Sequence, residues 1–128
     1  MQRTIKFRGK RVDNGEWVYG YGVVLDWEFD MANIIHSQGV NRMQCTAVDP
    51  ATVGQFTGLT DKNGKEIWEG DIVKVWIETN TDTEHPILMT FQVEFKNGEF
   101  RAGPRAGQRF AECEVIGNIY EHGSLFDK

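Results

Sequence analysis

Apolar and polar residues alternate with a period of two along several segments of this chain, and this alternation predicts β-strands. Ile5 and Phe7 alternate with Lys6 and Arg8, which indicates a half-buried first strand with a basic face. The segment 17–25 predicts a second strand with two unlike faces. One face carries the large residues Trp17, Tyr19, Tyr21, Val23 and Leu25, and the other carries the small residues Val18, Gly20, Gly22 and Val24. Glycine inside a strand is typical of a bend or of a close approach by another backbone.

Turn signals separate the remaining predicted strands. Three Asn-Gly pairs, at 14–15, 63–64 and 97–98, favour hairpins, and the first of them is typical of a type I′ turn. Between them we expect a hairpin of 33–37 with 44–48, strands at 53–59, 72–77, 87–95, 100–102, 114–116 and 118–120, and one helical turn at 110–112. Segments 26–33, 79–86 and 103–108 are expected to be loops, and Asp49-Pro50 is expected to end a strand.

The composition supports a β-protein and excludes several other classes. The chain has 128 residues, with only 4 Leu and 6 Ala against 29 Val, Ile and Thr, which argues against a helical bundle. Val, Ile, Leu and Phe make up 32 residues, too many for a disordered chain. Apolar runs are far shorter than the roughly 18 residues of a membrane helix, and the start lacks a signal-peptide pattern. We therefore expect a cytoplasmic protein without membrane contact.

The charge is distributed unevenly along the chain. The net charge is −5, but residues 1–12 carry five cations and no acid, so the other 116 residues sum to −10. The basic start has two explanations: a charged strand that protects a sheet edge, or a local site for an anion, a nucleic acid or an acidic partner. Cys45 and Cys113 are far apart in sequence, and both are expected to be buried thiols in a reducing compartment.

The aromatic face of the second strand also has two explanations. Large aromatic residues most often belong to a core. Next to a basic strand they can instead form a stacking platform for single-stranded nucleic acid or an interface between copies of the chain. The candidate binding residues on this hypothesis are Arg3, Lys6, Arg8, Lys10, Trp17, Tyr19 and Tyr21.

The sequence offers little support for catalysis or for a metal. Asp61-Lys62-Asn63-Gly64-Lys65 begins like a calcium loop, but its fifth and sixth positions do not fit, so we interpret it as a hairpin turn. His36, His85 and His122 are scattered, without the paired spacing of a zinc site. The acids at 49, 61, 66, 69 and 71 are dense enough to supply an acid–base pair, but turn and capping roles explain them. We expect no cofactor, no metal and no enzyme activity.

Three stretches taken together resemble the YopX family of phage and prophage proteins. They are IKFRGK with NGEWVYG, then VDP followed by VGQFTGLTDKNGKEIWEGDIV, and finally CEVIGNIYE. Phe56 and Trp68 stand where the family often has Tyr, and His122-Gly123 where it often has Asn-Pro. The resemblance implies an all-β fold with an SH3-like barrel in the C-terminal half, self-association, and a bacterial or phage setting. It brings no activity and no functional residue.

These observations together predict one small all-β domain over residues 1–128. N-terminal β-hairpins (1–60) are expected to pack on an SH3-like barrel (61–121) that a short tail (122–128) follows; the turn that ends in Gly70-Asp71 before a β-branched strand also favours such a barrel. We expect a phage-encoded, non-catalytic module that binds an unidentified protein partner or assembles with itself, since a chain of many hairpins leaves sheet edges to cover. The alternative is a nucleic-acid-binding β-module that uses the basic strand and its aromatic neighbours.

Overall fold

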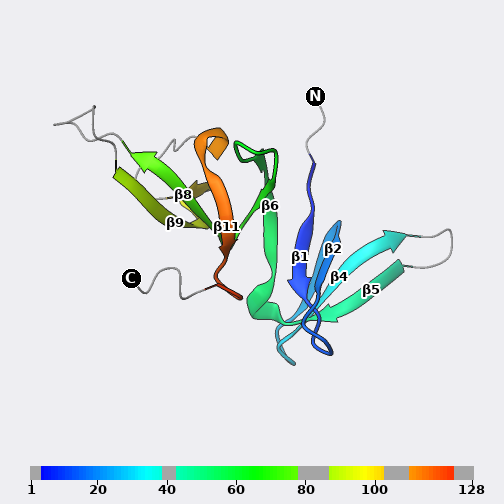
Figure 1. The fold of residues 1–128 in the computed structure, drawn as a ribbon. Coiled ribbons are helices and arrows are strands. Elements are labelled where there is room, and N and C mark those ends of the chain that lie inside the picture. The colour runs from blue at the N-terminus through cyan, green and yellow to red at the C-terminus, as the bar shows by residue number, and fades with distance from the viewer. Residues whose placement is uncertain (1–3, 39–42, 78–86, 103–109, 123–128) are drawn as a thin grey trace. The chain divides into compact units, whose positions relative to one another are not determined.

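The computed structural model of the chain describes residues 4–38, 43–77, 87–102 and 110–122, and these residues form an all-β protein (Figure 1). The strands are β1 (Phe7–Lys10), β2 (Trp17–Gly20), β3 (Gly22–Asp26), β4 (Met31–Gln38), β5 (Met43–Val48), β6 (Gly54–Thr60), β7 (Glu66–Trp68), β8 (Asp71–Ile77), β9 (Ile87–Lys96), β10 (Glu99–Ala102) and β11 (Glu114–Asn118). Two short 3₁₀ turns, η1 (Pro50–Thr52) and η2 (Phe110–Glu112), complete the described elements. None of the helical segments in these ranges is long and apolar enough to cross a membrane.

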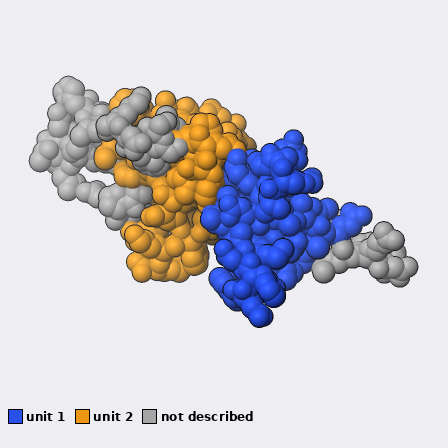
Figure 2. Space-filling model, turned by 90° about the horizontal axis from the view of Figure 1, so that it is seen from below, with its two compact units in different colours: residues 1–56 blue, residues 57–128 orange. Residues whose placement is uncertain are grey.

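The strands form three antiparallel sheets, in the orders β2-β1-β6-β7, β3-β4-β5 and β10-β9-β8-β11. The chain divides into two compact units, residues 1–56 and 57–128, which Figure 2 shows in different colours. The boundary falls inside β6. The expected division at residue 60 stays a prediction.

Unit 1 has a small core between two sheets. Ala32, Ile34 and Val48 are buried, and the side chains packed against them are Phe7, Val18, Val23 and Val53. Strands β1 and β2 pair as a hairpin with Phe7 opposite Gly20, so the inner face of that hairpin is the one with the small residues. Asp49 caps η1 by accepting a hydrogen bond from the backbone N–H of Ala51 at 3.0 Å, which confirms the break expected there.

Unit 2 has the larger core. Its buried residues are Ile67, Val73, Val75, Val93, Ala102, Phe110, Cys113 and Val115. They come from strands β7 to β11, from η2 and from Cys113 between η2 and β11, so this core is assembled from distant parts of the chain. The predicted helical turn at 110–112 is confirmed as η2.

The Asn-Gly turns confirm the hairpins, but they differ in conformation. At the turn between β9 and β10, Asn97 and Gly98 have φ of 54° and 82°, as a type I′ turn requires. Among the described residues the other non-glycine residue with positive φ is Asp30, so the type I′ prediction for Asn14 is wrong. That turn is wider, because the N–H of Gly15 reaches back to the carbonyl of Arg11 at 3.0 Å.

Two further predictions about strands need correction. The segment 17–25 is two strands that belong to different sheets, with a bend at Tyr21 between them. The segment 26–33 is largely the turn and second strand of the β3–β4 hairpin, which pairs Gly22 with Ile35 and Asp26 with Met31. In contrast, the expected hairpin of 33–37 with 44–48 is confirmed as β4 and β5. Residues 79–86 and 103–108 lie outside the described residues.

The C-terminal strands meet the prediction only in part. Residues 114–120 were expected as two strands around Gly117, but β11 is one strand with a bulge between Val115 and Gly117. Within the described ranges the strand orders close into no ring, so the SH3-like barrel stays a prediction. The structure confirms the coarser expectation of a small all-β protein.

Candidate interaction surface

The basic strand and its aromatic neighbours share one face of the β1–β2 hairpin. In the observed register Arg8 lies opposite Tyr19 and Lys10 lies opposite Trp17. Residues opposite each other in an antiparallel pair point to the same side of the sheet. The structure therefore brings Arg8, Lys10, Trp17 and Tyr19 together, while the other side of the hairpin packs against the core of unit 1. We call this set, together with Lys6, the cation–aromatic face.

Cations and rings on the cation–aromatic face contact each other directly. The guanidinium of Arg8 lies 4.2 Å from the ring centre of Trp17, and the ammonium of Lys10 lies 5.2 Å from the same ring. The ammonium of Lys6 lies 4.8 Å from the ring centre of Phe56 in β6. Such contacts are worth about 0.5–2 kcal/mol each, more when the cation is desolvated. The face is thus held together by its own cation–π contacts.

The position of β1 contradicts the hypothesis of a protected edge. Strand β1 lies between β2 and β6, so it is an inner strand of its sheet, and Arg8 is only 6% exposed. A long charged side chain is almost never buried to this degree unless it is paired, and the Trp17 ring supplies one of its partners. Arg3, the first of the candidate residues, lies outside the described residues.

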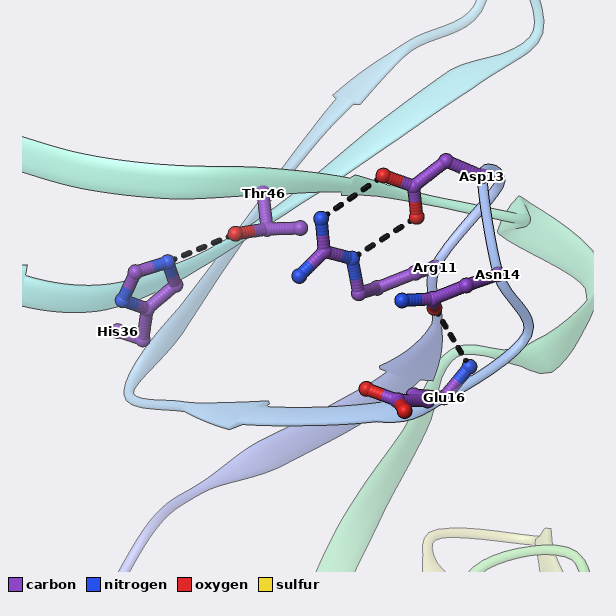
Figure 3. Close-up of polar contacts among 6 residues, drawn as sticks. All are labelled: Arg11, Asp13, Asn14, Glu16, His36 and Thr46. Carbon is purple, nitrogen blue, oxygen red and sulfur yellow. Dashed lines mark hydrogen bonds and ion pairs between the residues drawn. The ribbon is translucent and has the colours of Figure 1, made fainter.

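Polar contacts order the turn between β1 and β2 (Figure 3). The guanidinium of Arg11 donates two hydrogen bonds to Asp13, at 2.9 and 2.8 Å, and these bonds lower the pKa of that carboxyl and raise the pKa of Arg11. The side chain of Asn14 accepts a hydrogen bond from the backbone of Glu16 at 2.9 Å. In the β4–β5 hairpin, a ring nitrogen of His36 is 2.8 Å from the hydroxyl of Thr46. All of these contacts are local, and those of Arg11, Asp13 and Asn14 hold the shape of the β1–β2 turn.

The aromatic residues that follow Trp17 are exposed, so the core explanation is wrong for Tyr19 and Tyr21. Tyr19 is 50% exposed and Tyr21, at the bend, is 73% exposed. The face with the glycines turns inward, because β4 passes too close to Gly20 for a larger side chain there. A side chain at Gly20 would fall inside van der Waals distance of the Ile35 carbonyl oxygen and only 2.6 Å from a methyl group of Ile34.

A second exposed apolar cluster lies in the β3–β4 hairpin, of which residues 26–33 were expected to be a loop. Trp27 is 84% exposed and Phe29 is 67% exposed at its tip, and three flanking residues are also exposed, namely Val24, Leu25 and Met31. Large exposed apolar residues that gather on one element are typical of interaction sites. The sequence carried one signal for this cluster: the aromatic residues Trp27 and Phe29 stand between acidic residues in the segment 26–30.

The tip of this hairpin is also acidic. The segment Asp26-Trp27-Glu28-Phe29-Asp30 alternates carboxylates with aromatic rings. The carboxylate of Asp26 accepts hydrogen bonds from the backbone N–H groups of Glu28 and Phe29, at 3.1 and 3.3 Å, and so fixes the turn. Asp30 completes it with a φ of 52°. The tip therefore presents its rings and charges in an ordered turn.

The residues considered for catalysis have structural contacts. Asp49 caps η1, and the buried carboxylate of Asp71 accepts a hydrogen bond from the backbone N–H of Trp68 at 2.7 Å. Asp61 is also buried and accepts bonds from the turn after β6, as the interpretation of a hairpin turn requires. Among the residues that the structure describes, no three His, Cys, Asp or Glu side chains gather as a metal site would need.

The two thiols differ in environment. Cys113 is buried in unit 2, and burial, with the negative charges of Glu112 and Asp61, raises its pKa to about 11. A thiol with so high a pKa is a poor nucleophile at neutral pH. Cys45 is exposed on β5, so the expectation that both thiols are buried is wrong for this residue.

The comparisons with known proteins give a family. The fold defines a small all-β protein whose described residues include an exposed apolar and acidic hairpin tip and a cation–aromatic face. The model of the YopX protein family matches residues 6–127, and the chain belongs to this family.

The fold is shared with a solved protein. The crystal structure of protein EF1440 from Enterococcus faecalis is similar, with a TM-score of 0.55 and 21% sequence identity. The similarity covers 97% of this chain and 99% of the other. At this identity the likeness concerns the fold alone. No curated protein matches the chain.

Proposed function

We propose that this protein is a non-catalytic interaction and assembly module that associates with copies of itself through the β3–β4 hairpin of unit 1. The observation that carries this proposal is the exposure of Trp27 and Phe29 at the tip of a hairpin whose strand residues Val24, Leu25 and Met31 are also exposed. Leaving such residues in water costs about 25 cal/mol for each Å² that a partner could cover. Association removes that cost.

The setting of this function is part of the same proposal. The resemblance of the sequence to phage and prophage proteins supports an accessory protein that acts in the cytoplasm of a bacterial host, and the assembly includes an unidentified protein partner. An SH3-like barrel in the C-terminal half, a module common in protein interactions, fits this role.

Light scattering over a range of protein concentrations tests self-association. We expect the average mass to rise with concentration and to exceed that of one chain at high micromolar protein. A matched pair of variants assigns the surface: Trp27→Ser should lower the average mass, whereas Trp76→Ser, at an exposed tryptophan of unit 2, should leave it unchanged. A wild-type protein that stays monomeric throughout would contradict the proposal.

The second candidate function is binding of single-stranded nucleic acid by the cation–aromatic face. It is favoured by the alternation of cations and rings there, since such surfaces combine charge with stacking. It is the weaker candidate because Arg8 is buried and the Trp17 ring already contacts two cations. If Lys6→Ala and Lys10→Ala together leave binding of a labelled single strand unchanged, this candidate is wrong.

A further inference from the structure

Strand β3 is the edge of its sheet in unit 1 and lacks the lysine, proline or bulge that often blocks such an edge. In the sheet order β3-β4-β5, β4 is the one strand neighbour of β3 among the described residues. An edge strand presents backbone N–H and C=O groups to any strand that approaches, and proteins usually block it with lysine, proline or a bulge. The five residues of β3, Gly22–Asp26, include no lysine and no proline, and the register with β4 is regular.

The side chains of β3 suit a partner strand as well as its backbone does. Val23 packs against the core of unit 1, but Val24 and Leu25, which point to opposite sides of the sheet, are 48% and 43% exposed. Apolar side chains exposed on both sides of an edge strand lose water contact when another strand pairs beside them.

We infer that two copies of this chain pair through β3, antiparallel, about a two-fold axis at Val24. This inference rests on the proposed function and names its contact. In such a pair Val24 lies opposite Val24 of the second copy, and Val23 lies opposite Leu25. Both copies use the same surface, as a two-fold interface requires, and the contact closes after two chains.

The charges of unit 1 select the antiparallel arrangement. A parallel pair would place the acidic tips of both copies, each with Asp26, Glu28 and Asp30, side by side. In the antiparallel pair the tips lie at opposite ends of the paired strands, so their like charges are kept apart. Avoidance of like-charge contacts fixes the orientation of an interface.

Charged variants at Val24 test the axis directly. Because Val24 faces its own symmetry mate, Val24→Lys and Val24→Asp each place like charges opposite each other. We expect the dissociation constant of either variant to rise about tenfold or more, since like charges directly opposite destabilise a cross-strand pair. An equimolar mixture of the two variants should associate again, because each mixed pair joins a lysine to an aspartate. The matched control is Val12→Lys, at a valine that is 66% exposed in the β1–β2 turn of the same unit.

Sedimentation velocity on the full chain separates the outcomes, with circular dichroism to verify that each variant keeps the β-fold. Loss of association in both variants and its recovery in the mixture support the inference. Variants that associate as the wild type does, or a mixture that stays dissociated, overturn it, while self-association through another surface would still stand. A wild-type chain that is monomeric overturns both the inference and the proposed function. If a Val24 variant unfolds, Leu25→Lys and Leu25→Asp replace the pair. In the proposed register either new charge would face the apolar Val23 of the second copy, so each variant on its own should associate more weakly than the wild type.

Discussion

At the residue scale, one buried carboxylate connects distant parts of unit 2. Asp61 is 5% exposed, and its two oxygens accept backbone N–H bonds from Asn63 at 2.8 Å, Lys65 at 2.9 Å and Val115 at 2.9 Å. The first two bonds form the turn between β6 and β7, and the third joins that turn to β11. Burial alone would raise the pKa of Asp61, but the hydrogen bonds from Val115, Lys65 and Asn63 outweigh it, so its pKa lies below the ordinary value.

Asp61→Asn should lower the free energy of unfolding by about 1–3 kcal/mol at neutral pH, because a buried N–H loses its charged acceptor. The lowered pKa also sets a pH dependence. The stabilisation is fully present above about pH 4, the ordinary pKa of an aspartate, and is lost as the pH falls through the lowered pKa of the folded state. Urea unfolding at neutral and acid pH measures both effects.

The variant should therefore show a flatter acid dependence than the wild type. Asp13→Asn is the matched control, since its ion pair with Arg11 is exposed and contributes little. Equal acid dependence in the wild type and Asp61→Asn would show that Asp61 does not contribute to acid unfolding.

At the element scale, the bend at Tyr21 decides which side chains of residues 17–26 are buried. The N–H of Tyr21 donates to the carbonyl of Ile35 at 2.8 Å, where the chain leaves the β1–β2 hairpin and enters the sheet of β3, β4 and β5. Gly20 makes this crossing possible because it has no side chain where β4 passes. The exposure of Tyr19 and Tyr21 follows from the same crossing.

Gly20→Ala should destabilise unit 1 by about 3 kcal/mol or more, because the new methyl group meets a backbone oxygen that cannot move aside as a side chain can. Gly15→Ala is the matched control. Gly15 has a φ of 74° but no atom within 4 Å of an added methyl group, so that variant should lose only about 1–2 kcal/mol, from the left-handed conformation. Denaturant unfolding followed by tryptophan fluorescence compares the two. If both variants lose the same free energy, backbone contact at Gly20 is not the constraint.

At the scale of the whole molecule, the two candidate functions differ in how strongly salt should affect them, because the chain is charged. Each chain carries −5, so copies repel one another at long range, and salt screens that repulsion. The proposed contact at β3 is mainly apolar and main-chain.

We therefore expect the dissociation constant of self-association to change less than about threefold between 50 and 300 mM salt, because the contact is mainly apolar and main-chain and exposed charges contribute little. Analytical ultracentrifugation at several salt concentrations measures it. Binding of a nucleic acid would instead weaken steeply over the same range, because each neutralised phosphate releases counterions. A steep loss of self-association with salt would show that charge rather than apolar contact holds the copies together.

Much of the fold could be predicted from local patterns. The hairpins at 14–15, 63–64 and 97–98, the strand pair of 33–37 with 44–48, and the break at Asp49-Pro50 each depend on a few neighbouring residues whose backbone preferences are strong. The candidate site was predicted in part. Residues two apart along a strand point to the same side, and so do residues opposite each other in two paired strands. The residues that share one face for these reasons are Lys6, Arg8, Lys10, Trp17 and Tyr19. The burial of Arg8 could not be predicted, since the position of β1 between β2 and β6 depends on pairing with a segment more than forty residues away.

The class of the protein, most of its strands and turns, and its family follow from the amino-acid sequence alone, because alternation, turn chemistry and motif order can all be seen along the chain. Which face of each strand is exposed depends instead on the fold. Residues 17–25 alternate evenly, but a bend at one residue divides them between two sheets and turns the glycine face inward. Residues 26–30 have no strand pattern, yet the pairing of β3 with β4 holds Trp27 and Phe29 in solvent. Burial depends on contacts between residues far apart in the sequence. Alternation with a period of two shows that a strand has two unlike sides, but it does not show which side packs against the rest of the protein.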